Sequence, residues 1–568
     1  MEWRLLPCDP RRIEAVSAAY NLPPAIARLL VLRGLDDEEA IHTFFSPSLS
    51  RLPDPLSIKD MGQAVDRILK AIKDKERIAV FGDYDADGVT ATALLIRFLR
   101  PFAPHLDFYI PHRVREGYGL SIDALTTLKK SGVSLVITVD CGISNHQELD
   151  HAGDLGLEVI VTDHHQISKK GLPPAWAVIN PRRVDCPFPF KDLAGVGVAF
   201  YLVIALRQAM EQAGLFPEGK PNLKAFLDLV ALGTIADVVP LLGVNRILVR
   251  EGLEVLSRSP QPGLAALKEI SGIETEKPLS AYDIAFRLAP RINALGRVDS
   301  ADDGVRLLLA EALDPARDLA RRMDRENTRR QSLEQKMLEE IEEILRRRPE
   351  LSEKRALVLG SETWHRGVLG LVASKLAERF SKPVFLFSIE GETAHGSGRS
   401  VEGFHLFKGL EALDECLIGY GGHEAAAGAA LKSQDLALFA EALEDLVRRT
   451  LPEGLKDLYL TVEGEVPFSA LTQEIAPYLP WMAPFGEKNP EPPLVSRGVK
   501  ILSLRLVGKG HLKVKLEQGG ILLEGIAFGR GEEGLKQGDV VDLAYHPFFS
   551  NYNGSQKLEL RLRDIRPA

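Results

Sequence analysis

Short apolar runs alternate with helix-like stretches through much of the first half of the chain. The strands that this pattern predicts are Ile78–Phe81, Ser134–Val139, Leu157–Thr162 and Trp176–Ile179, and a helix is predicted at Thr90–Leu99. Strands that are apolar on both faces and alternate with helices are typical of a mostly parallel sheet with helices on both sides. The predicted fold class is therefore α/β.

A long, highly charged stretch at Glu311–Arg348 separates this unit from a second α/β unit. The pattern is helical from Leu193 to about Gly233, and we interpret Glu311–Arg348 as one long helix that joins two domains. Its charges include Arg321, Arg322, Arg325, Arg329 and Arg330, followed by Glu339, Glu340, Glu342 and Glu343. A solvent-exposed helix face explains most of these charges.

The second α/β unit and the C-terminal region differ in pattern. Strands at Ala356–Leu359 and Val384–Phe387 flank a helix at Val368–Phe380. From about Leu455 onward, short β-type runs are separated by Gly, Pro and Asn, which is typical of a small β-barrel such as an OB-fold. The predicted runs are Tyr459–Val462, Leu502–Val507, Leu512–Leu516, Ile521–Phe528, Val540–Ala544 and Leu558–Arg563.

Composition narrows the class of protein only slightly. The 568 residues are too many for one hydrophobic core. The chain opens with no basic-then-apolar signal and has no apolar run long enough to span a bilayer, so we expect a cytoplasmic protein. Four scattered cysteines form no CxxC pair, which argues against a zinc site or a disulfide framework. The net charge of −9 argues mildly against nucleic-acid binding, but such binding depends on local basic patches.

The segment Phe81–Gly88 carries Asp83, Asp85 and Asp87 between a predicted buried strand and a predicted helix. Ligands of an open parallel sheet bind at the carboxyl ends of its strands. Carboxylates this close together repel one another unless cations neutralise them. An EF-hand loop is the main alternative, but its flanking helices are missing and its twelfth position, which requires Glu, is Leu94.

The next two predicted strands also end in polar side chains. One ends before Asp140, and the other is followed by Asp163, His164 and His165. A single Asp after a strand is usually a helix cap, but Asp or His at three successive strand ends indicates a shared metal site. Mixed carboxylate and imidazole ligands favour Mn²⁺ or Mg²⁺ over zinc, and two such ions can activate water for in-line phosphoryl displacement. The sequence has no G-x-S-x-G elbow and no P-loop signature, which disfavours acyl hydrolysis and ATP-driven action.

The Asp163-His164-His165 motif resembles that of the DHH phosphoesterase superfamily. The superfamily's metal ligands match Asp85, Asp87, Asp140, His164 and Asp237 of this chain. The resemblance implies hydrolysis of phosphodiester bonds with two Mn²⁺ or Mg²⁺ ions. It leaves Asp83 and His165 as further candidates, either as ligands of the second ion or as supports of the ligands.

Other segments resemble the RecJ branch of this superfamily, in order along residues 50–568. They are His112–Gly119, Arg287–Arg297, Trp364–Gly370, Ser397–Ser400, Gly421–Gly428 and Pro484–Pro490. The resemblance implies a single-strand-specific 5′→3′ DNA exonuclease that acts in DNA repair and recombination. The chain departs from the branch at Lys488 and Val244, where Gly and Glu are frequent, and neither position is a proposed ligand.

The resemblance also implies nucleic-acid contacts outside the metal motif. Arg113, Arg399 and Ser397 are expected to bind the 5′ phosphate, because a guanidinium group binds phosphate bidentately. The alternative for each arginine is a surface salt bridge. Tyr118 is expected to stack on a base, and its alternative is a packed loop aromatic. The remaining candidates are Arg297 for charge on the scissile phosphate, and His365 and His423 for phosphate contact or structural packing.

The expected domain order is an N-terminal helical extension (1–55), a DHH catalytic domain (56–305), a connecting helix (306–350), a DHH-associated domain (351–454) and an OB-fold domain (455–568). The barrel is expected to bind the strand downstream. Lys509, Lys513 and Lys515 form a candidate basic strip there, and a solvated strand face explains them equally well. A narrow channel between the two DHH units would exclude duplex DNA by size.

Two other functions remain open. One is a DHH hydrolase of short oligonucleotides or cyclic dinucleotides, although the extra β-rich module favours a long substrate. The other is a non-catalytic DNA-binding scaffold, although every expected ligand position holds Asp or His. By resemblance, a single-strand-binding protein and a RecQ-like helicase are expected partners, no membrane is involved, and the chain is expected to be a monomer.

Overall fold

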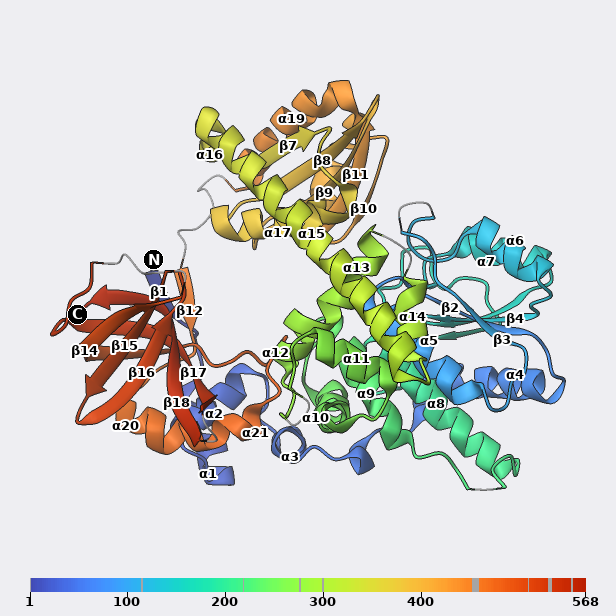
Figure 1. The fold of residues 1–568 in the computed structure, drawn as a ribbon, viewed down its shortest axis with the longest axis horizontal. Helices are drawn as coiled ribbons and strands as arrows, with labels where there is room; N and C mark the ends of the chain where they lie inside the picture. The colour runs from blue at the N-terminus through green and yellow to red at the C-terminus, as the bar shows by residue number, and fades with distance from the viewer. Residues whose placement is uncertain are drawn as a thin grey trace.

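A computed structural model describes residues 2–113, 116–217, 219–274, 277–298, 301–451, 459–508, 510–529, 534–552 and 555–568. Val114 and Arg115 of the His112–Gly119 motif, and Lys509 of the candidate basic strip, lie outside these residues. Figure 1 shows a parallel-sheet unit on the right, a second α/β unit at the top and a β-barrel on the left. A long helix, α15, runs diagonally from the first unit to the second.

The first unit is built on a five-stranded parallel sheet in the order β3-β2-β4-β5-β6. Its strands are β2 (Ile78–Gly82), β3 (Leu106–Tyr109), β4 (Leu135–Val139), β5 (Glu158–Thr162) and β6 (Ala177–Ile179). The predicted α/β class and parallel sheet are confirmed. The apolar pattern misses β3, because this half-exposed edge strand carries Asp107 among its four residues.

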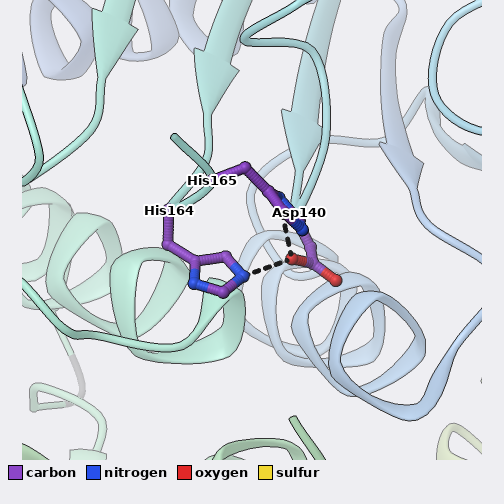
Figure 2. Close-up of side chains that lie close together, drawn as sticks. All are labelled: Asp140, His164 and His165. Atoms are coloured by element: carbon purple, nitrogen blue, oxygen red, sulfur yellow. Dashed lines mark ion pairs between the residues drawn. The ribbon is translucent and has the colours of Figure 1, made fainter. Parts of the chain in front are cut away.

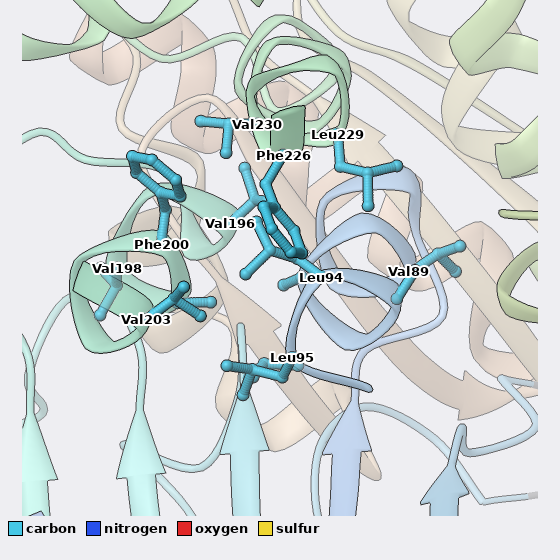
Figure 3. Close-up of a cluster of buried hydrophobic side chains, with 14 of the residues drawn as sticks. Val89, Leu94, Leu95, Val196, Val198, Phe200, Val203, Phe226, Leu229 and Val230 are labelled. Carbon is cyan, nitrogen blue, oxygen red and sulfur yellow. The ribbon is translucent and has the colours of Figure 1, made fainter. Parts of the chain in front are cut away.

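Helices cover both faces of this sheet, as predicted. One face packs on α4 (Met61–Lys73), α5 (Ala86–Leu99) and α8 (Gly195–Gln212), and the other on α6 (Ile122–Lys130) and α7 (His146–Asp154). A further helix, α9 (Leu227–Ala236), contacts both α5 and α8. Figure 3 shows side chains of these three helices, including Leu94, Val196 and Leu229, meeting in one buried cluster above the strands.

The chain from α9 to the second unit is helical. Its elements are α10 (Gly243–Arg258), α11 (Pro262–Ile270), α12 (Ala281–Asp283), the π-helical turn η4 (Ile284–Leu288), α13 (Ala289–Val298), α14 (Asp302–Leu308), α15 (Leu313–Arg347) and α16 (Glu350–Glu353). The predicted connecting helix is confirmed as one 35-residue element, α15. Met323 in its first half belongs to the core of the first unit, and Ile341 in its second half belongs to the core of the second.

The second unit has a five-stranded sheet in the order β10-β11-β9-β8-β7. Its elements are β7 (Leu357–Ser361), α17 (Leu369–Phe380), β8 (Val384–Glu390), β9 (Thr393–Arg399), α18 (Leu406–Glu411), β10 (Gly419–Gly422), β11 (Ala426–Lys432) and α19 (Leu436–Thr450). The predicted strands and helix correspond to β7, α17 and β8. The sequence pattern misses β9, β10 and β11, because they consist largely of Gly, Ala and Ser and lack an apolar run.

The C-terminal strands close into a barrel, as predicted. They are β14 (Leu494–Val507), β15 (His511–Gln518), β16 (Ile521–Ala527), β17 (Val540–Tyr552) and β18 (Ser555–Pro567). The order is β14-β15-β16-β18-β17, and pairing of β17 with β14 completes the closure. Three of these strands extend well beyond the predicted runs, because their polar outward positions interrupt the apolar signal.

The first and last parts of the chain pack together. The N-terminal extension is helical in α1 (Pro10–Tyr20), α2 (Pro24–Leu32) and α3 (Glu38–Phe45), but it begins with a strand, β1 (Glu2–Leu5). This strand pairs in parallel with β12 (Tyr459–Val462), so the prediction of that run as a barrel strand is wrong. The short elements β13 (Gly464–Glu465), α20 (Phe468–Ala470) and α21 (Leu479–Met482) precede the barrel.

Within the described residues no single helix has the length and apolarity to cross a membrane, while α1 and α2 together meet both criteria across a bend of 117°.

Candidate metal centre and nucleic-acid interface

The turn between β2 and α5 presents the first three aspartates. Asp85 caps α5, since its Oδ1 accepts the backbone N–H groups of Asp87 (2.9 Å) and Gly88 (3.1 Å). This cap starts the helix at Ala86, four residues before the predicted Thr90. Asp87 therefore lies inside the first helical turn, and only Asp83 and Asp85 are in the connection.

Asp87 is held from a second element, the N-terminus of α8. The backbone N–H of Gly195 donates to Asp87 Oδ2 (2.6 Å) and that of Val196 donates to Oδ1 (2.8 Å). A Cβ atom at Gly195 would lie only 2.6 Å from the Cβ of Asp140, so this position requires glycine. The helix end thus fixes Asp87 and Asp140 at the same time.

The ends of β4 and β5 bring Asp140 and the two histidines together, as Figure 2 shows. Asp140 has a left-handed backbone with φ of 62°, which turns its side chain back over the sheet edge. Its Oδ1 lies 3.1 Å from His164 Nε2 and 3.9 Å from His165 Nδ1. The predicted meeting of strand-end ligands is therefore present in the structure.

Asp237 joins this cluster from the end of a helix. It is the C-cap of α9, and its Oδ2 lies 3.5 Å from His164 Nε2, which is also 4.0 Å from Asp87 Oδ2. Asp237 does not follow a strand, so the strand pattern does not predict it. Only the resemblance to the DHH superfamily identifies it as a candidate ligand.

The cluster offers three overlapping sets of metal-ligating atoms. Within each set the ligand atoms lie within 4.8 Å of one another: Asp83, Asp85 and Asp140; Asp87, His164 and Asp237; and Asp140, His164 and His165. Several buried polar atoms here have no hydrogen-bond partner among the described residues, namely Asp83 Oδ1, Asp140 Oδ1, Asp237 Oδ2 and both ring nitrogens of His164. Buried polar atoms without partners are rare in folded proteins, so this donor set fits divalent cations.

The electrostatics support the same interpretation. Burial and the neighbouring Asp85 charge raise the pKa of Asp87 to about 7. Burial and the charge of Asp87 raise the pKa of Asp140 well above its ordinary range, and the same two causes act on Asp237. Burial and the charge of His165 lower the pKa of His164 to about 3, so its imidazole is neutral, the form that binds metal. Cations at this centre would relieve the carboxylate repulsion.

Asp163 forms hydrogen bonds with both histidines, although the sequence analysis assigned it no role. Its Oδ1 accepts the backbone N–H of His164 (2.7 Å) and lies 2.7 Å from His165 Nδ1, and its Oδ2 accepts the N–H of Ile143 (2.9 Å). Burial opposes ionisation of Asp163, but the hydrogen bond and charge of His165 prevail and lower its pKa to about 2. Burial also opposes protonation of His165, but the hydrogen bond and charge of Asp163 prevail and raise the pKa of His165 to about 9.

Tyr118 lies against the candidate metal ligands. Its hydroxyl donates to the backbone carbonyl of Asp140 (3.2 Å) and lies 3.1 Å from His165 Nδ1. Its ring packs edge-on to Tyr84, with centroids 6.5 Å apart, yet the residue is 46% exposed. Tyr118 is therefore packed in its loop and still presents surface to the solvent, and its stacking on a base stays a prediction.

Arginines gather on another side of the centre. Arg297, at the end of α13, donates from Nη1 to the carbonyl of Gly367 (3.2 Å) in the turn before α17. Burial lowers the pKa of Arg297 to about 10, aided by the charges of Arg113, Arg330 and Arg399, while Asp85 opposes the shift. On β9, Arg399 Nη1 donates to Ser397 Oγ (3.2 Å). The structure thus brings Arg113, Arg297, Ser397 and Arg399 to one region and adds Arg330, which the sequence indicated only as part of an exposed helix face.

The two remaining histidines lie in the second α/β unit. His365 caps the short turn η5 (Arg366–Val368), where its Nδ1 accepts the N–H of Gly367 (3.0 Å). His423 is exposed between β10 and β11, and its backbone N–H donates to the carbonyl of Ala426, the residue paired with Arg399 across β11 and β9. Neither imidazole contacts the metal cluster among the described residues.

One lysine of the candidate basic strip of the barrel, Lys513, is neutralised by carboxylates. Lys513 Nζ lies 2.8 Å from Glu524 Oε2 and 3.6 Å from Glu559 Oε1. This arrangement favours the solvated strand face for Lys513. A cavity of about 1470 Å³ does lie between the barrel and the first unit. It is lined by residues that include Val238, next to Asp237, together with Phe286, Phe485 and Phe548.

Three family models match successive parts of the chain. They are the DHH family, N-terminal domain, over residues 77–234, the DHHA1 domain over residues 353–449, and the RecJ OB domain over residues 462–564. The chain is also 39% identical over 579 residues to the single-stranded-DNA-specific exonuclease RecJ of Salmonella typhimurium, covering 98% of this chain and 99% of that protein. The chain belongs to the RecJ family. The family predicted from the motifs is thus confirmed.

Other RecJ proteins agree with this assignment. The Escherichia coli protein is 38% identical over 575 residues, covering 98% of each chain. The crystal structure of RecJ in complex with Mn²⁺ from Thermus thermophilus superposes with a TM-score of 0.83 at 33% identity, covering 100% of this chain and 80% of that one. A second structure of that RecJ, in complex with Mg²⁺, superposes with a TM-score of 0.76. The predicted choice of Mn²⁺ or Mg²⁺ matches the ions named for these structures.

Proposed function

We propose that this chain is a single-strand-specific 5′→3′ DNA exonuclease that hydrolyses phosphodiester bonds with two divalent metal ions. One observation supports this most strongly. Carboxylates and a neutral imidazole from the ends of β2, β4, β5 and α9 converge in groups whose ligand atoms lie within 4.8 Å of one another, and arginines gather beside them. Relatives along almost the whole chain are named single-stranded-DNA-specific exonucleases.

We assign the metal ligands to two overlapping groups. Asp87, His164 and Asp237 would hold one Mn²⁺ or Mg²⁺ ion, and Asp83, Asp85 and Asp140 would hold the other. When bound, such ions supply Lewis acidity and a hydroxide near neutral pH. Asp163 keeps His165 protonated beside this centre, so His165 can donate a hydrogen bond to a phosphate oxygen. No side-chain nucleophile is required.

The arginines would set the polarity of cleavage. Arg113 and Arg399, with the hydroxyl of Ser397, would bind the 5′ phosphate, and Arg297 would stabilise charge on the scissile phosphate. A phosphate held at this position leaves the next phosphodiester bond at the metal ions. Tyr118 would contact the terminal nucleotide, since it is exposed and lies against Asp140 and His165.

The rest of the strand would leave through the cavity beside the barrel. Its wall begins next to Asp237 and continues past Phe286 to Phe548, over which Arg561 lies at 5.2 Å. Exposed aromatic rings and guanidinium groups bind single strands without sequence preference. We therefore expect little sequence preference and exclusion of duplex DNA by size.

The expected cellular role extends this proposal. A 5′→3′ single-strand exonuclease would act in DNA repair and recombination in the cytoplasm, supplied with single strands by a RecQ-like helicase and assisted by a single-strand-binding protein. Hydrolysis of short oligonucleotides or cyclic dinucleotides is disfavoured by the closed barrel, and a scaffold role by the complete ligand set. A monomer is expected, because one chain supplies every proposed site residue.

The test is cleavage of a 3′-labelled single-stranded oligonucleotide with Mn²⁺, compared with the same strand in a blunt duplex. We expect progressive shortening of the single strand from its 5′ end, no cleavage of the duplex, and no cleavage by the Asp85→Ala variant. Cleavage of dinucleotides alone would support the small-substrate alternative. Binding without cleavage would support the scaffold.

A further inference from the structure

The buried side of α15 changes its chemistry in the middle. Its inward positions are spaced by four and three residues in turn: Ala316, Ala320, Met323, Asn327, Arg330, Glu334, Met337 and Ile341. The first three belong to the core of the DHH unit and the last two to the core of the DHHA1 unit. Asn327, Arg330 and Glu334 therefore occupy the stretch between the two cores.

Two of these three polar residues, Asn327 and Arg330, are not fully satisfied. Asn327 is 3% exposed, and its Oδ1 has no hydrogen-bond donor within the described part of the chain. The buried Nε of Arg330 likewise has no acceptor there. Glu334 forms ion pairs with Arg330 at 3.6 Å and with Lys375. Polar atoms buried in this way destabilise a fold unless a ligand or water completes their bonding.

The surroundings of Arg330 favour an anion. Its helix contacts α13, which carries Arg297, and also η5 and α17. The charges of Arg113, Arg330 and Arg399 all act on Arg297. Helix α17 also lies close to β9 here, since a Cβ at Gly370 would lie 2.8 Å from Arg399 Nη2 and 3.0 Å from Ser397 Oγ. Four guanidinium groups from separate elements thus cluster where the proposed substrate phosphates would lie.

We propose that the connecting helix is part of the substrate site, with Arg330 donating hydrogen bonds to a phosphate oxygen of the single strand. Glu334 orients the Arg330 guanidinium through their ion pair and is a positioning residue. Asn327 lies one turn before Arg330 on the same buried side of the helix. This inference rests on the proposed exonuclease function and adds the α15 helix to it.

The first test compares Arg330→Gln with Arg321→Gln, a change at an exposed arginine of the same helix that forms an ion pair with Asp318. We would measure binding of a fluorescent single strand in EDTA, and KM and kcat with Mn²⁺. Arg330→Gln should weaken binding and raise KM on the order of ten- to a hundredfold, as expected for a lost bond to a charged group. The slope of log K against log salt should fall by about 0.7, the value for one phosphate contact on a single strand. Arg321→Gln should bind like the wild type.

The 5′ end distinguishes the phosphate that is bound. If Arg330 contacts the terminal phosphate, its loss should matter for a 5′-phosphorylated strand and little for a 5′-hydroxyl strand. If it contacts an internal phosphate, both strands should lose equally. Wild-type-like binding and salt slope in Arg330→Gln, while the wild type cleaves, would overturn this inference alone. A wild type that neither binds nor cleaves would overturn the exonuclease proposal as well.

A thermal melt would show whether Arg330→Gln is folded. If it is not, two further variants test the inference. Asn327→Asp is nearly isosteric and places a negative charge one turn before Arg330, so binding should weaken while the melting temperature stays close to wild type. Arg330→Lys keeps the charge but loses the planar fork, and should recover part of the affinity. Unchanged binding in a folded Asn327→Asp would contradict the proposed contact.

Discussion

At the scale of single residues, the carboxylates of the metal centre have unusual proton affinities. The pKa of Asp87 is raised by burial and Asp85 to about 7, and the pKa of Asp140 is raised well above its ordinary range by burial and Asp87. An aspartate in the unfolded chain titrates at about 4. Between these values the metal-free folded state binds more protons than the unfolded chain, so its stability falls as pH rises from about 4 toward 7.

We therefore expect stabilisation by Mn²⁺ to increase with pH. The difference in melting temperature with and without Mn²⁺ should be small at pH 5 and largest at pH 7.5, because the ions relieve a repulsion that protons relieve at low pH. Differential scanning fluorimetry measures both series. Asp140→Asn should raise the metal-free melting temperature at pH 7.5 and reduce the Mn²⁺ effect. A pH-independent Mn²⁺ effect would contradict the proposed ligand set.

Asp163 has a supporting role that a second variant tests. It accepts N–H bonds from the loops after β4 and β5 and fixes the ring of His165. Loss of a group that orients metal ligands reduces metal affinity or activity by about 10- to 100-fold. We expect this loss for Asp163→Asn in a Mn²⁺ titration of activity, and no loss for Asp123→Asn, an exposed aspartate in α6. Equal behaviour of the two variants would remove Asp163 from the site.

At the scale of elements, helix ends position the ligands. Asp85 caps α5, the N-terminus of α8 binds Asp87, and the C-terminus of α9 carries Asp237. Such helix ends have free backbone groups that side chains can satisfy. The three helices pack on one another in the cluster of Figure 3, so their buried side chains fix the relative placement of the ligands.

Gly195 tests this arrangement. In Gly195→Ala the new Cβ would lie 2.6 Å from Asp140 Cβ and Oδ1, so α8 or Asp140 must move. We expect the variant to lose the Mn²⁺-dependent thermal shift and most of its nuclease activity. Gly153→Ala in α7 is the matched control, because a Cβ there meets nothing within 4 Å. Normal metal response in Gly195→Ala would show that this contact does not define the site.

One departure from the family pattern also has an element-level explanation. Lys488, where the RecJ branch often has Gly, has φ of 58° in the turn after Pro484. The left-handed region favours glycine because it lacks a Cβ. The neighbouring carbonyl of Glu487 accepts the backbone N–H of Leu241 (2.9 Å), which ties this turn to the segment after Asp237.

At the scale of the whole molecule, Arg246 joins three distant parts of the chain. It is completely buried in α10, and it donates to the backbone carbonyls of Phe44, Trp481, Met482 and Ala483. Its guanidinium also lies 3.8 Å from the ring centroid of Phe44. Arg246 therefore links the N-terminal helices, the DHH unit and the segment before the barrel.

Replacing Arg246 should loosen this junction. Arg246→Met leaves four buried carbonyls without their donor, and we expect a loss of about 2–4 kcal/mol in the free energy of unfolding. Urea unfolding measures this loss, and limited proteolysis should cut more readily near residues 479–490. Arg250→Met, one turn further along α10 and bonded only to the Trp481 carbonyl (3.3 Å) in the described structure, should lose less. An unchanged unfolding midpoint in Arg246→Met would contradict this role.

The sequence by itself determined the parallel sheet, the connecting helix, the barrel and most of the candidate metal ligands. Local pattern carries this information, because runs of apolar residues form buried strands and parallel strands end at one edge of their sheet. Asp85, Asp140 and His164 follow such strands, so their meeting is a consequence of the strand order. The resemblance to known relatives added Asp237, which no strand end indicates.

Only the tertiary structure decided which distant segments meet. The pairing of β1 with β12, the four carbonyls around Arg246 and the inward face of Arg330 join residues far apart in the chain. Periodicity shows that α15 is amphipathic. It does not distinguish a buried charged residue, such as Arg330, from the charged residues on the exposed side of the helix. Packing against two cores decides which charges are buried, and with them which arginine lies beside the proposed substrate.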